Sequence, residues 1–215
     1  GFLPEAMLNY LVRLGWSHGD QEVFTRRELI EVFDLELIGR SAGICDTEKL
    51  LALNADHIRA TPPEKLVALL TPFLKQRGIE TDNRSLLIQV IETLHARSKT
   101  LDDMAQQALF YFADDIDYEE KAAKKFLKPA VLDALKLLIS QFELLADFSE
   151  ENLENAFKTV MDQTGLKLGK IAQPVRVALT GKTASPGIFE VTATLGKDKV
   201  ISRLKKAVRF IESKG

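Results

Sequence analysis

Residues 168–190 have the sequence LGKIAQPVRVALTGKTASPGIFE. Apolar residues recur at helical spacing on both sides of a loop, residues 180–185, that contains hydroxyl side chains, a glycine and a lysine. Ser185 followed by Pro186 is typical of a helix start, with the serine as the cap and the proline in the first turn. The first-turn N–H groups of that helix have no helical acceptor, and Arg176 lies one turn before the loop. This stretch therefore predicts two helices that frame a polar loop suited to a phosphate or a base edge.

The rest of the chain also predicts helices. Cap signals precede apolar runs of helical period at Thr25 with Glu28, at Asp46 and at Asn83, and Gly78 and Gly165 follow two of the runs. No alternation of period two is supported by hairpin turns, so we expect strands to be absent or trivial. The predicted fold class is all-α.

Proline-containing boundaries predict the domain organisation. Thr61-Pro62-Pro63-Glu64 combines a cap, a first-turn proline and a capping-box glutamate, so we place a small helical unit at residues 1–60 and a larger helical domain at residues 61–215. A second pair, Thr71-Pro72, is expected to break or kink the helix that follows. Pro129 begins a long apolar helix, and a subdomain boundary is possible near residue 129.

Charge is distributed unevenly, although the net charge of the whole chain is only -2. Residues 164–215 carry eleven basic and three acidic side chains, a net +8, whereas residues 100–163 carry six basic and fourteen acidic ones, a net −8. Such a chain presents one attractive and one repulsive surface to a polyanion. The alternative is that these charges are solvated helix faces with accidental asymmetry.

Length and composition are those of a globular protein. The chain has 215 residues, 46% of them hydrophobic, and no apolar run approaches the length of about 20 residues that a membrane span needs. We therefore expect no membrane partner. The single cysteine, Cys45, excludes an internal disulfide and fits a reducing cytoplasm.

No catalytic or metal-binding pattern is legible. Gly181-Lys182-Thr183 resembles the end of a phosphate-binding Walker motif, but Arg176 stands where that motif needs its first glycine. The three histidines and Cys45 have no spacing typical of a metal site or a nucleophile–base pair. The acidic run from Asp114 to Glu120 lacks the central glycine of a calcium loop, so a solvated link is favoured. We predict no catalytic residue, no metal and no cofactor in this chain.

Several stretches resemble the carboxyl-terminal region of bacterial glutamyl-tRNA synthetases. They are residues 173–181 (QPVRVALTG), residues 185–190 (SPGIFE), residues 1–20 (GFLPEAMLNYLVRLGWSHGD), and Asp46-Thr47-Glu48-Lys49-Leu50 with Leu53-Asn54 and His57-Ile58. The resemblance covers essentially the whole chain in the family's order. It implies the multihelical anticodon-binding domain of class I synthetases, made of two all-α subdomains, after a small helical unit that contacts the tRNA stem.

The resemblance also implies an RNA-binding site. Arg97, before Lys99-Thr100-Leu101, matches the family position that probes the third anticodon base, which implies preference for the glutamate-type base and exclusion of glutamine tRNA. From the residues alone, the favoured interpretation is that Arg97 complements the dipole at the end of the preceding helix, and the resemblance reverses this. Arg176 matches an arginine that contacts the first anticodon base. The matching residues of the loop against which the first two bases lie are Ser185, Pro186, Gly187 and Ile188.

What the family implies for activity is only partly present here. Such a synthetase uses ATP and Mg²⁺ to attach glutamate to its tRNA, through a His-Ile-Gly-His-like and a Lys-Met-Ser-Lys-Ser-like signature. His57-Ile58-Arg59-Ala60 is not the first signature, and nothing in the sequence resembles the second. We therefore expect the catalytic domain to be absent and the chain alone to be inactive. Its expected partners are the anticodon loop and stem of glutamate tRNA and the catalytic domain of the same enzyme, not DNA.

Two other classes remain open. One is a helical protein–protein scaffold whose basic face binds an acidic partner; insensitivity to salt and no binding to tRNA would favour it. The other is an unrecognised helical enzyme, for which a compact pocket with coupled titratable groups would be the sign.

Overall fold

The computed structural model describes residues 1–39 and 43–214. These residues form twelve α-helices and two short 3-10 helices, and their only β-type pairing is an isolated bridge between His18 and Gln21. The predicted all-α class is confirmed. None of the described helices combines the length and the apolar character that crossing a membrane requires.

The chain divides into two compact units, Gly1–Ala108 and Leu109–Gly215. The boundary between these units, after Ala108, differs from the functional boundary that we predict after residue 60. Within unit 1, Asn54 joins both sides of that boundary: its Oδ1 accepts from Leu3 N at 2.8 Å and its Nδ2 donates to Lys99 O at 2.5 Å. The assignment of residues 1–60 to the tRNA stem remains a prediction.

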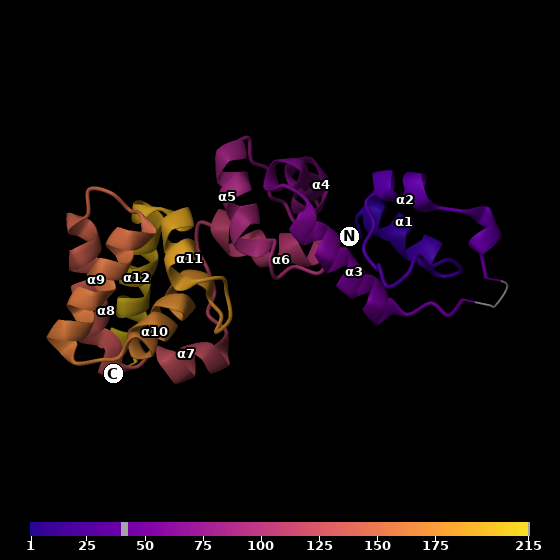
Figure 1. Ribbon diagram of the computed structural model, residues 1–215. Coiled ribbons are helices and arrows are strands. Elements are labelled where there is room, and N and C mark those ends of the chain that lie inside the picture. The colour runs from indigo at the N-terminus through magenta and orange to yellow at the C-terminus, as the bar shows by residue number, and fades with distance from the viewer. Residues whose placement is uncertain (40–42, 215) are drawn as a thin grey trace. The chain divides into compact units, whose positions relative to one another are not determined.

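Unit 1 is built from short helices, coloured indigo to magenta in Figure 1. They are α1 (Pro4–Arg13), α2 (Arg26–Val32), η1 (Leu35–Leu37), α3 (Thr47–Ala60), α4 (Pro63–Lys75), α5 (Arg84–Leu94) and the first part of α6 (Leu101–Phe112). α1 packs on α3 and α2, and α4 packs on α5. Two small apolar clusters support the first half, one around Tyr10, Leu50 and Leu53 and one around Trp16, Phe24 and Leu29.

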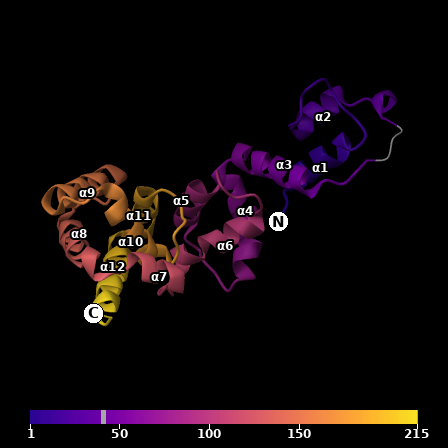
Figure 2. The same cartoon turned by 90° about the horizontal axis from the view of Figure 1, so that it is seen from below.

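Unit 2 is a bundle in which α12 packs on α8 and α10, while α9 packs on α8 and α11 (Figures 1 and 2). Its elements are α7 (Glu120–Phe126), η2 (Pro129–Val131), α8 (Leu132–Leu144), α9 (Glu150–Thr164), α10 (Leu168–Thr180), α11 (Ile188–Leu195) and α12 (Lys197–Glu212). The core contains residues that are fully buried, among them Leu138, Phe142, Phe157, Val175 and Leu204. Burial of each such side chain contributes about 1.5–3 kcal/mol to folding.

Most predicted helix ends are confirmed. Thr25 and Glu28 form the capping box of α2, and Asp46 Oδ1 accepts from the backbone N–H groups of Glu48 and Lys49. Asn83 caps α5 through Leu86 N at 3.0 Å. Gly165 closes α9 with a φ of 69°, a left-handed conformation that glycine adopts without strain.

Around α4 the predicted cap is wrong and the predicted break is wrong, while a kink at Pro72 stays a prediction. Thr61 does not cap this helix, because the N-cap is Pro62. The Thr61 hydroxyl donates instead to His57 O at 2.7 Å and closes α3. The Thr71-Pro72 pair does not break the helix, because α4 runs through Pro72 to Lys75. Four buried residues on one face of α4 (Leu66, Val67, Leu70 and Leu74) offset the hydrogen bond that the proline cannot donate.

Candidate nucleic-acid interface

The predicted site loop of unit 2 occupies residues 181–187, between α10 and α11. Gly181 ends α10 with a φ of 76° and donates its N–H to Val177 O at 2.9 Å. Gly187 is the N-cap of α11, and its N–H donates to Glu190 Oε2 at 3.0 Å. The prediction that Ser185 caps this helix is therefore wrong, since the helix begins two residues later and the capping carboxylate comes from Glu190.

Ser185 is bound by Arg176 instead. The Nη1 group of Arg176 donates to Ser185 O at 3.1 Å and to Pro186 O at 2.7 Å, and it also contacts Ser185 Oγ. Ser185 Oγ in turn donates to Pro186 O at 2.9 Å. The structure thus brings together three predicted site residues, Arg176, Ser185 and Pro186. The guanidinium of Arg176 binds the backbone of the loop at the other two.

The exposure of the loop differs along its length. Lys182, Thr183, Ala184 and Gly187 are exposed, Ser185 is half-buried, and Pro186 and Ile188 are buried. Backbone and small side chains therefore form the accessible surface, framed by buried residues at its carboxyl end. At Gly187 the Glu190 side chain lies against the backbone and its carboxylate occupies the N–H, so this residue offers exposed backbone but no free N–H donor.

The start of the loop is fixed to the segment before α7. Gly181 O accepts from Glu119 N at 2.9 Å. A Cβ atom at position 181 would lie only 2.2 Å from Asp117 O, so no other residue fits without movement of the backbone. The acidic run that we predicted to be a solvated link thus includes backbone that packs directly against the loop.

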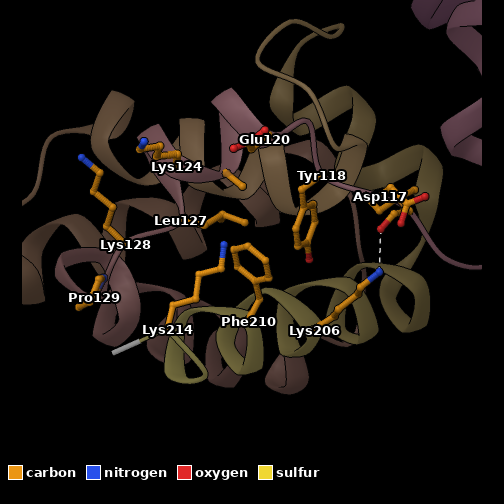
Figure 3. A pocket seen from close by; sticks show the side chains of 12 residues that line it. Asp117, Tyr118, Glu120, Lys124, Leu127, Lys128, Pro129, Lys206, Phe210 and Lys214 are labelled. Atoms are coloured by element: carbon orange, nitrogen blue, oxygen red, sulfur yellow. Dashed lines mark hydrogen bonds between the residues drawn. The ribbon is translucent and has the colours of Figure 1, made fainter.

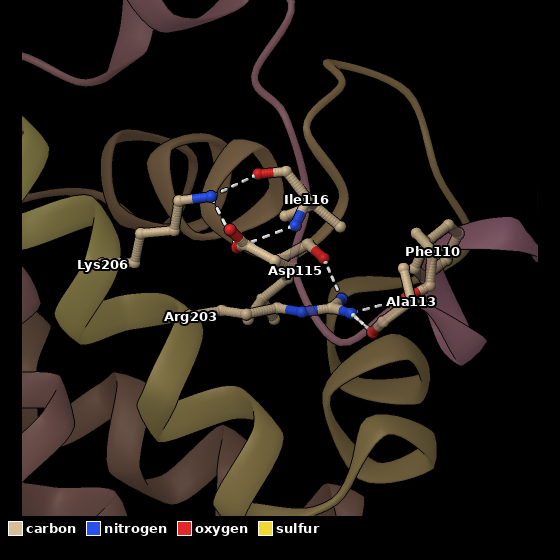
Figure 4. A network of polar contacts seen from close by, with 7 residues as sticks. Phe110, Ala113, Asp115, Ile116, Arg203 and Lys206 are labelled. Atoms are coloured by element: carbon tan, nitrogen blue, oxygen red, sulfur yellow. Dashed lines mark hydrogen bonds and ion pairs between the residues drawn. The ribbon is translucent and has the colours of Figure 1, made fainter.

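Many basic side chains after Gly165 are committed to contacts inside unit 2. Lys197 donates to Glu143 O and Leu145 O, Lys199 donates to Tyr111 O, and Lys205 pairs with Glu143. Lys206 donates to Asp115 Oδ1 at 2.5 Å and to Ile116 O at 2.7 Å (Figure 4). The net +8 therefore overstates the charge that this region offers to a polyanion.

Arg203 is the functional residue that the sequence pattern missed. It is only 2% exposed, and its guanidinium donates to Leu179 O at 2.6 Å, Phe110 O at 2.8 Å and Ala113 O at 2.6 Å (Figure 4). Burial lowers its pKa to about 10, which leaves it charged at neutral pH. Arg203 thereby binds the last turn of α10, from which the loop departs. The sequence indicated its burial only through its position, since Arg203 falls among the apolar positions of α12, between Val200 and Ala207.

Arg97 lies in unit 1, in the short connection between α5 and α6. Its N–H donates to Leu94 O at 3.1 Å, and the buried Ser98 hydroxyl donates to the same oxygen at 2.9 Å. Its side chain is exposed, and no described residue forms a hydrogen bond or an ion pair with the guanidinium. Thr100 then caps α6 through Asp103 N. The backbone at Arg97 is thus held by hydrogen bonds, while its planar guanidinium is exposed. The Arg176 site lies in the other unit, unit 2.

Comparison with known proteins agrees with these features. The sequence model of the anticodon-binding domain family matches residues 65–208, and that of the catalytic domain of class I tRNA synthetases (E and Q) matches residues 1–52. Glutamate–tRNA ligases of Syntrophobacter fumaroxidans and Geobacter sulfurreducens are 52% and 50% identical to this chain over 212 residues, 99% of its length. The chain spans 45% and 46% of those two relatives.

A solved structure agrees as well. The crystal structure of a glutamate tRNA ligase from Elizabethkingia meningosepticum has a TM-score of 0.88 and 26% identity, covering 98% of this chain and 42% of the other. Because the anticodon-binding model matches well over half of the residues, this chain belongs to the anticodon-binding domain family and corresponds to the carboxyl-terminal part of glutamate–tRNA ligases.

Proposed function

We propose that this chain is the tRNA-binding and anticodon-recognising portion of a glutamate–tRNA ligase, and that it selects glutamate tRNA. The observation that carries the proposal is the family match over residues 65–208, which includes Arg97 and the whole Arg176–Ile188 site. Anticodon bases are unstacked, and single-stranded loops are read on their exposed edges by side chains and backbone groups.

The loop of unit 2 receives the first two anticodon bases. Arg176 holds the backbone of Ser185 and Pro186, and the exposed Gly187 lets a base approach the chain. Arg176 contributes to recognition of the first base by fixing this shape and, as the family resemblance implies, by contact through its guanidinium. Pro186 and Ile188 supply the rigid apolar frame.

Arg97 reads the third base. The Watson–Crick edge of cytosine offers the acceptors N3 and O2, whereas guanine places N–H donors on the same edge. A guanidinium has only donors, so it can pair with both of these acceptors of cytosine, whereas on the same edge of guanine only O6 accepts and the N1–H and N2–H groups oppose it. The third anticodon base separates glutamate from glutamine tRNA in this way, which gives Arg97 the role of excluding the glutamine type.

The parent enzyme would attach glutamate to this tRNA at the expense of ATP, with Mg²⁺, in the cytoplasm. Support comes from the relatives, which are glutamate–tRNA ligases and about twice as long as this chain. Neither ATP-binding signature occurs here, so we assign the chemistry to the catalytic domain of the same enzyme, the second partner of this chain. Residues 1–60 would contact the tRNA stem.

A protein–protein scaffold is the alternative. Unit 1 exposes large apolar side chains, among them Ile30 at 75%, Leu35 at 74% and Ile44 at 86% exposure, which favours a protein contact on this part of the chain. A protein partner could bind this apolar surface whether or not the chain binds tRNA, so the two functions can be tested separately.

The experiment that tests the proposal is a fluorescence-anisotropy titration with glutamate tRNA and with an unrelated tRNA, each at two salt concentrations. We expect tighter binding of glutamate tRNA, weakened by salt because phosphate contacts release counterions. Equal affinity for both tRNAs would reduce the chain to an unselective RNA clamp. Binding to neither tRNA, together with salt-insensitive binding to another protein, would favour the scaffold.

A further inference from the structure

Unit 2 contains a groove of about 630 Å³ between α7 and α12, lined by none of the residues assigned to the anticodon site (Figure 3). Its apolar floor includes Leu127, Tyr118 and Phe210, and the two rings meet edge to face with centroids 5.2 Å apart. The groove is open to solvent along one side.

Cations gather at one end of this groove. Lys124, Lys128 and Lys214 line it, and none of the three forms an ion pair with a described residue. The ammonium group of Lys214 lies 4.1 Å from the centroid of the Phe210 ring. This end therefore presents three mobile donors beside an aromatic ring, a combination that suits an anion attached to an apolar body.

The other end of the groove holds an unsatisfied hydroxyl. Tyr118 Oη is buried and has no hydrogen-bond partner among the described residues. Burial raises the pKa of Tyr118 to about 12, so the group is a neutral donor at neutral pH. A buried polar atom without a partner costs free energy, which an acceptor on a bound ligand would recover once the Tyr118 ring turns to expose the hydroxyl. Two carboxylates, Asp117 and Glu120, also line this end and can accept from amino groups.

We propose that this groove binds one nucleotide of single-stranded RNA, with its phosphate at Lys124, Lys128 and Lys214 and its base against Tyr118 and Phe210. The inference rests on the proposed tRNA-binding function. RNA is favoured over an acidic peptide because the groove adjoins the segment before α7 that holds the proposed anticodon loop. Asp117 and Glu119, on either side of Tyr118, pack against Gly181, where that loop begins. Aromatic floors with basic rims bind single strands in a sequence-tolerant manner.

Helix α7 and the residues just after it offer a matched pair of variants. Lys124→Gln in α7 with Lys128→Gln after it removes two charges from the groove, whereas Lys121→Gln with Lys125→Gln removes two exposed charges of α7 outside it. We expect the groove variant to weaken tRNA binding and, because one phosphate contact is lost, to flatten the salt dependence by about 0.7 logarithmic units per decade of salt. The control variant should change both much less, and neither should alter discrimination at the third anticodon base. Equal effects of the two variants would overturn the proposal.

Tyr118→Phe is the second variant, because it removes only the unpartnered hydroxyl. We expect unchanged or slightly greater stability to urea, with a two- to tenfold loss of tRNA affinity, about the value of one hydrogen bond. Full affinity in this variant would show that no ligand uses the hydroxyl.

A ligand titration separates failure of this proposal from failure of the proposed function. Cytidine 5′-monophosphate, added to the chain, should shift the NMR resonances of the Tyr118 and Phe210 rings, and less so in the groove variant. If anticodon discrimination is present but these shifts are absent and the groove variant matches its control, only the groove assignment fails. If an acidic peptide shifts the same resonances and the nucleotide does not, the ligand class is wrong.

Discussion

At the scale of single residues, Arg203 has the surroundings with the clearest energetic consequence. Replacing it with methionine keeps most of its volume but leaves three carbonyl oxygens, on Leu179, Phe110 and Ala113, without this donor. Hydrogen bonds from a charged group contribute about 1.5–3 kcal/mol each and are not additive, so we expect Arg203→Met to lower the free energy of unfolding by about 3 kcal/mol or more.

Urea denaturation followed by circular dichroism measures this loss. Arg209→Met, an exposed position on the same helix, is the matched control and should change stability by less than about 0.5 kcal/mol. Similar small losses for both variants would mean that the three carbonyl oxygens find other donors.

His57 predicts a pH dependence of unit 1. The ring is 7% exposed, its Nε2 lies 3.0 Å from Asn9 Oδ1, and burial lowers its pKa despite the opposing charges of Glu5 and Asp56. Because the unfolded chain then binds a proton that the folded chain does not, His57 reduces stability as the pH falls below its unfolded pKa of about 6.5. The loss levels off below the lowered pKa of the folded state.

The fluorescence of Trp16, the single tryptophan and a buried residue of unit 1, reports this unfolding. The free energy of unfolding in urea should be smaller at pH 5.5 than at pH 7.5, and His57→Gln should reduce the difference. An unchanged difference in this variant would assign the pH dependence to other groups.

The sequence pattern located the polar loop and Arg176, but the anticodon roles of Arg97, Arg176 and the loop residues came only through resemblance to a family. Nothing in the composition separates the exposed Arg97 from an arginine at any helix end. Arg203 escaped prediction for a different reason: its partners are backbone carbonyls, which have no side-chain signature, and arginine is rarely buried. Its position within an apolar period was the one available sign.

At the scale of elements, Gly181 sets the path of the proposed anticodon loop. Both Gly181 and Gly165 end a helix in the left-handed conformation, but only at Gly181 would a Cβ meet backbone, whereas Gly165 faces open space. Gly165→Ala should therefore cost only about 1–2 kcal/mol from its dihedral angles. Gly181→Ala should cost more and displace residues 181–187, which lowers tRNA affinity by about tenfold or more.

Anisotropy titrations and urea denaturation of the two glycine variants measure both effects. Equal tRNA affinity in the two variants would contradict the assignment of this loop to the anticodon.

Helix ends were predictable where a side chain caps its own helix, as at Thr25, Asp46 and Asn83. They were not predictable where tertiary contacts decide. Ser185 precedes a proline and so has the sequence of a cap, yet Arg176 draws its hydroxyl away and the helix starts at Ile188. The pattern at Pro72 predicted a break, but the buried face of α4 outweighed it.

At the scale of the whole molecule, the sequence predicts an all-α chain whose charge is unevenly distributed. The structure changes how that charge distribution is interpreted. Lysines after Gly165 that look available in sequence are used to hold helices together, such as Lys199 at Tyr111 O. Charge counts along the chain cannot anticipate this, because partners in unit 2 are up to 93 residues apart, as for Arg203 and Phe110. The uncommitted lysines, not the total, should determine how strongly salt weakens binding to RNA.

The most direct test of the central claim compares glutamate tRNA with the same tRNA carrying G for C at the third anticodon base. We predict that the native chain prefers the C form by at least about tenfold, as one bidentate contact allows. Arg97→Gln should abolish the preference. Lys99→Gln, an exposed neighbour, should weaken binding to both tRNAs and keep the preference. Equal affinity of the native chain for the two tRNAs would contradict anticodon recognition by Arg97.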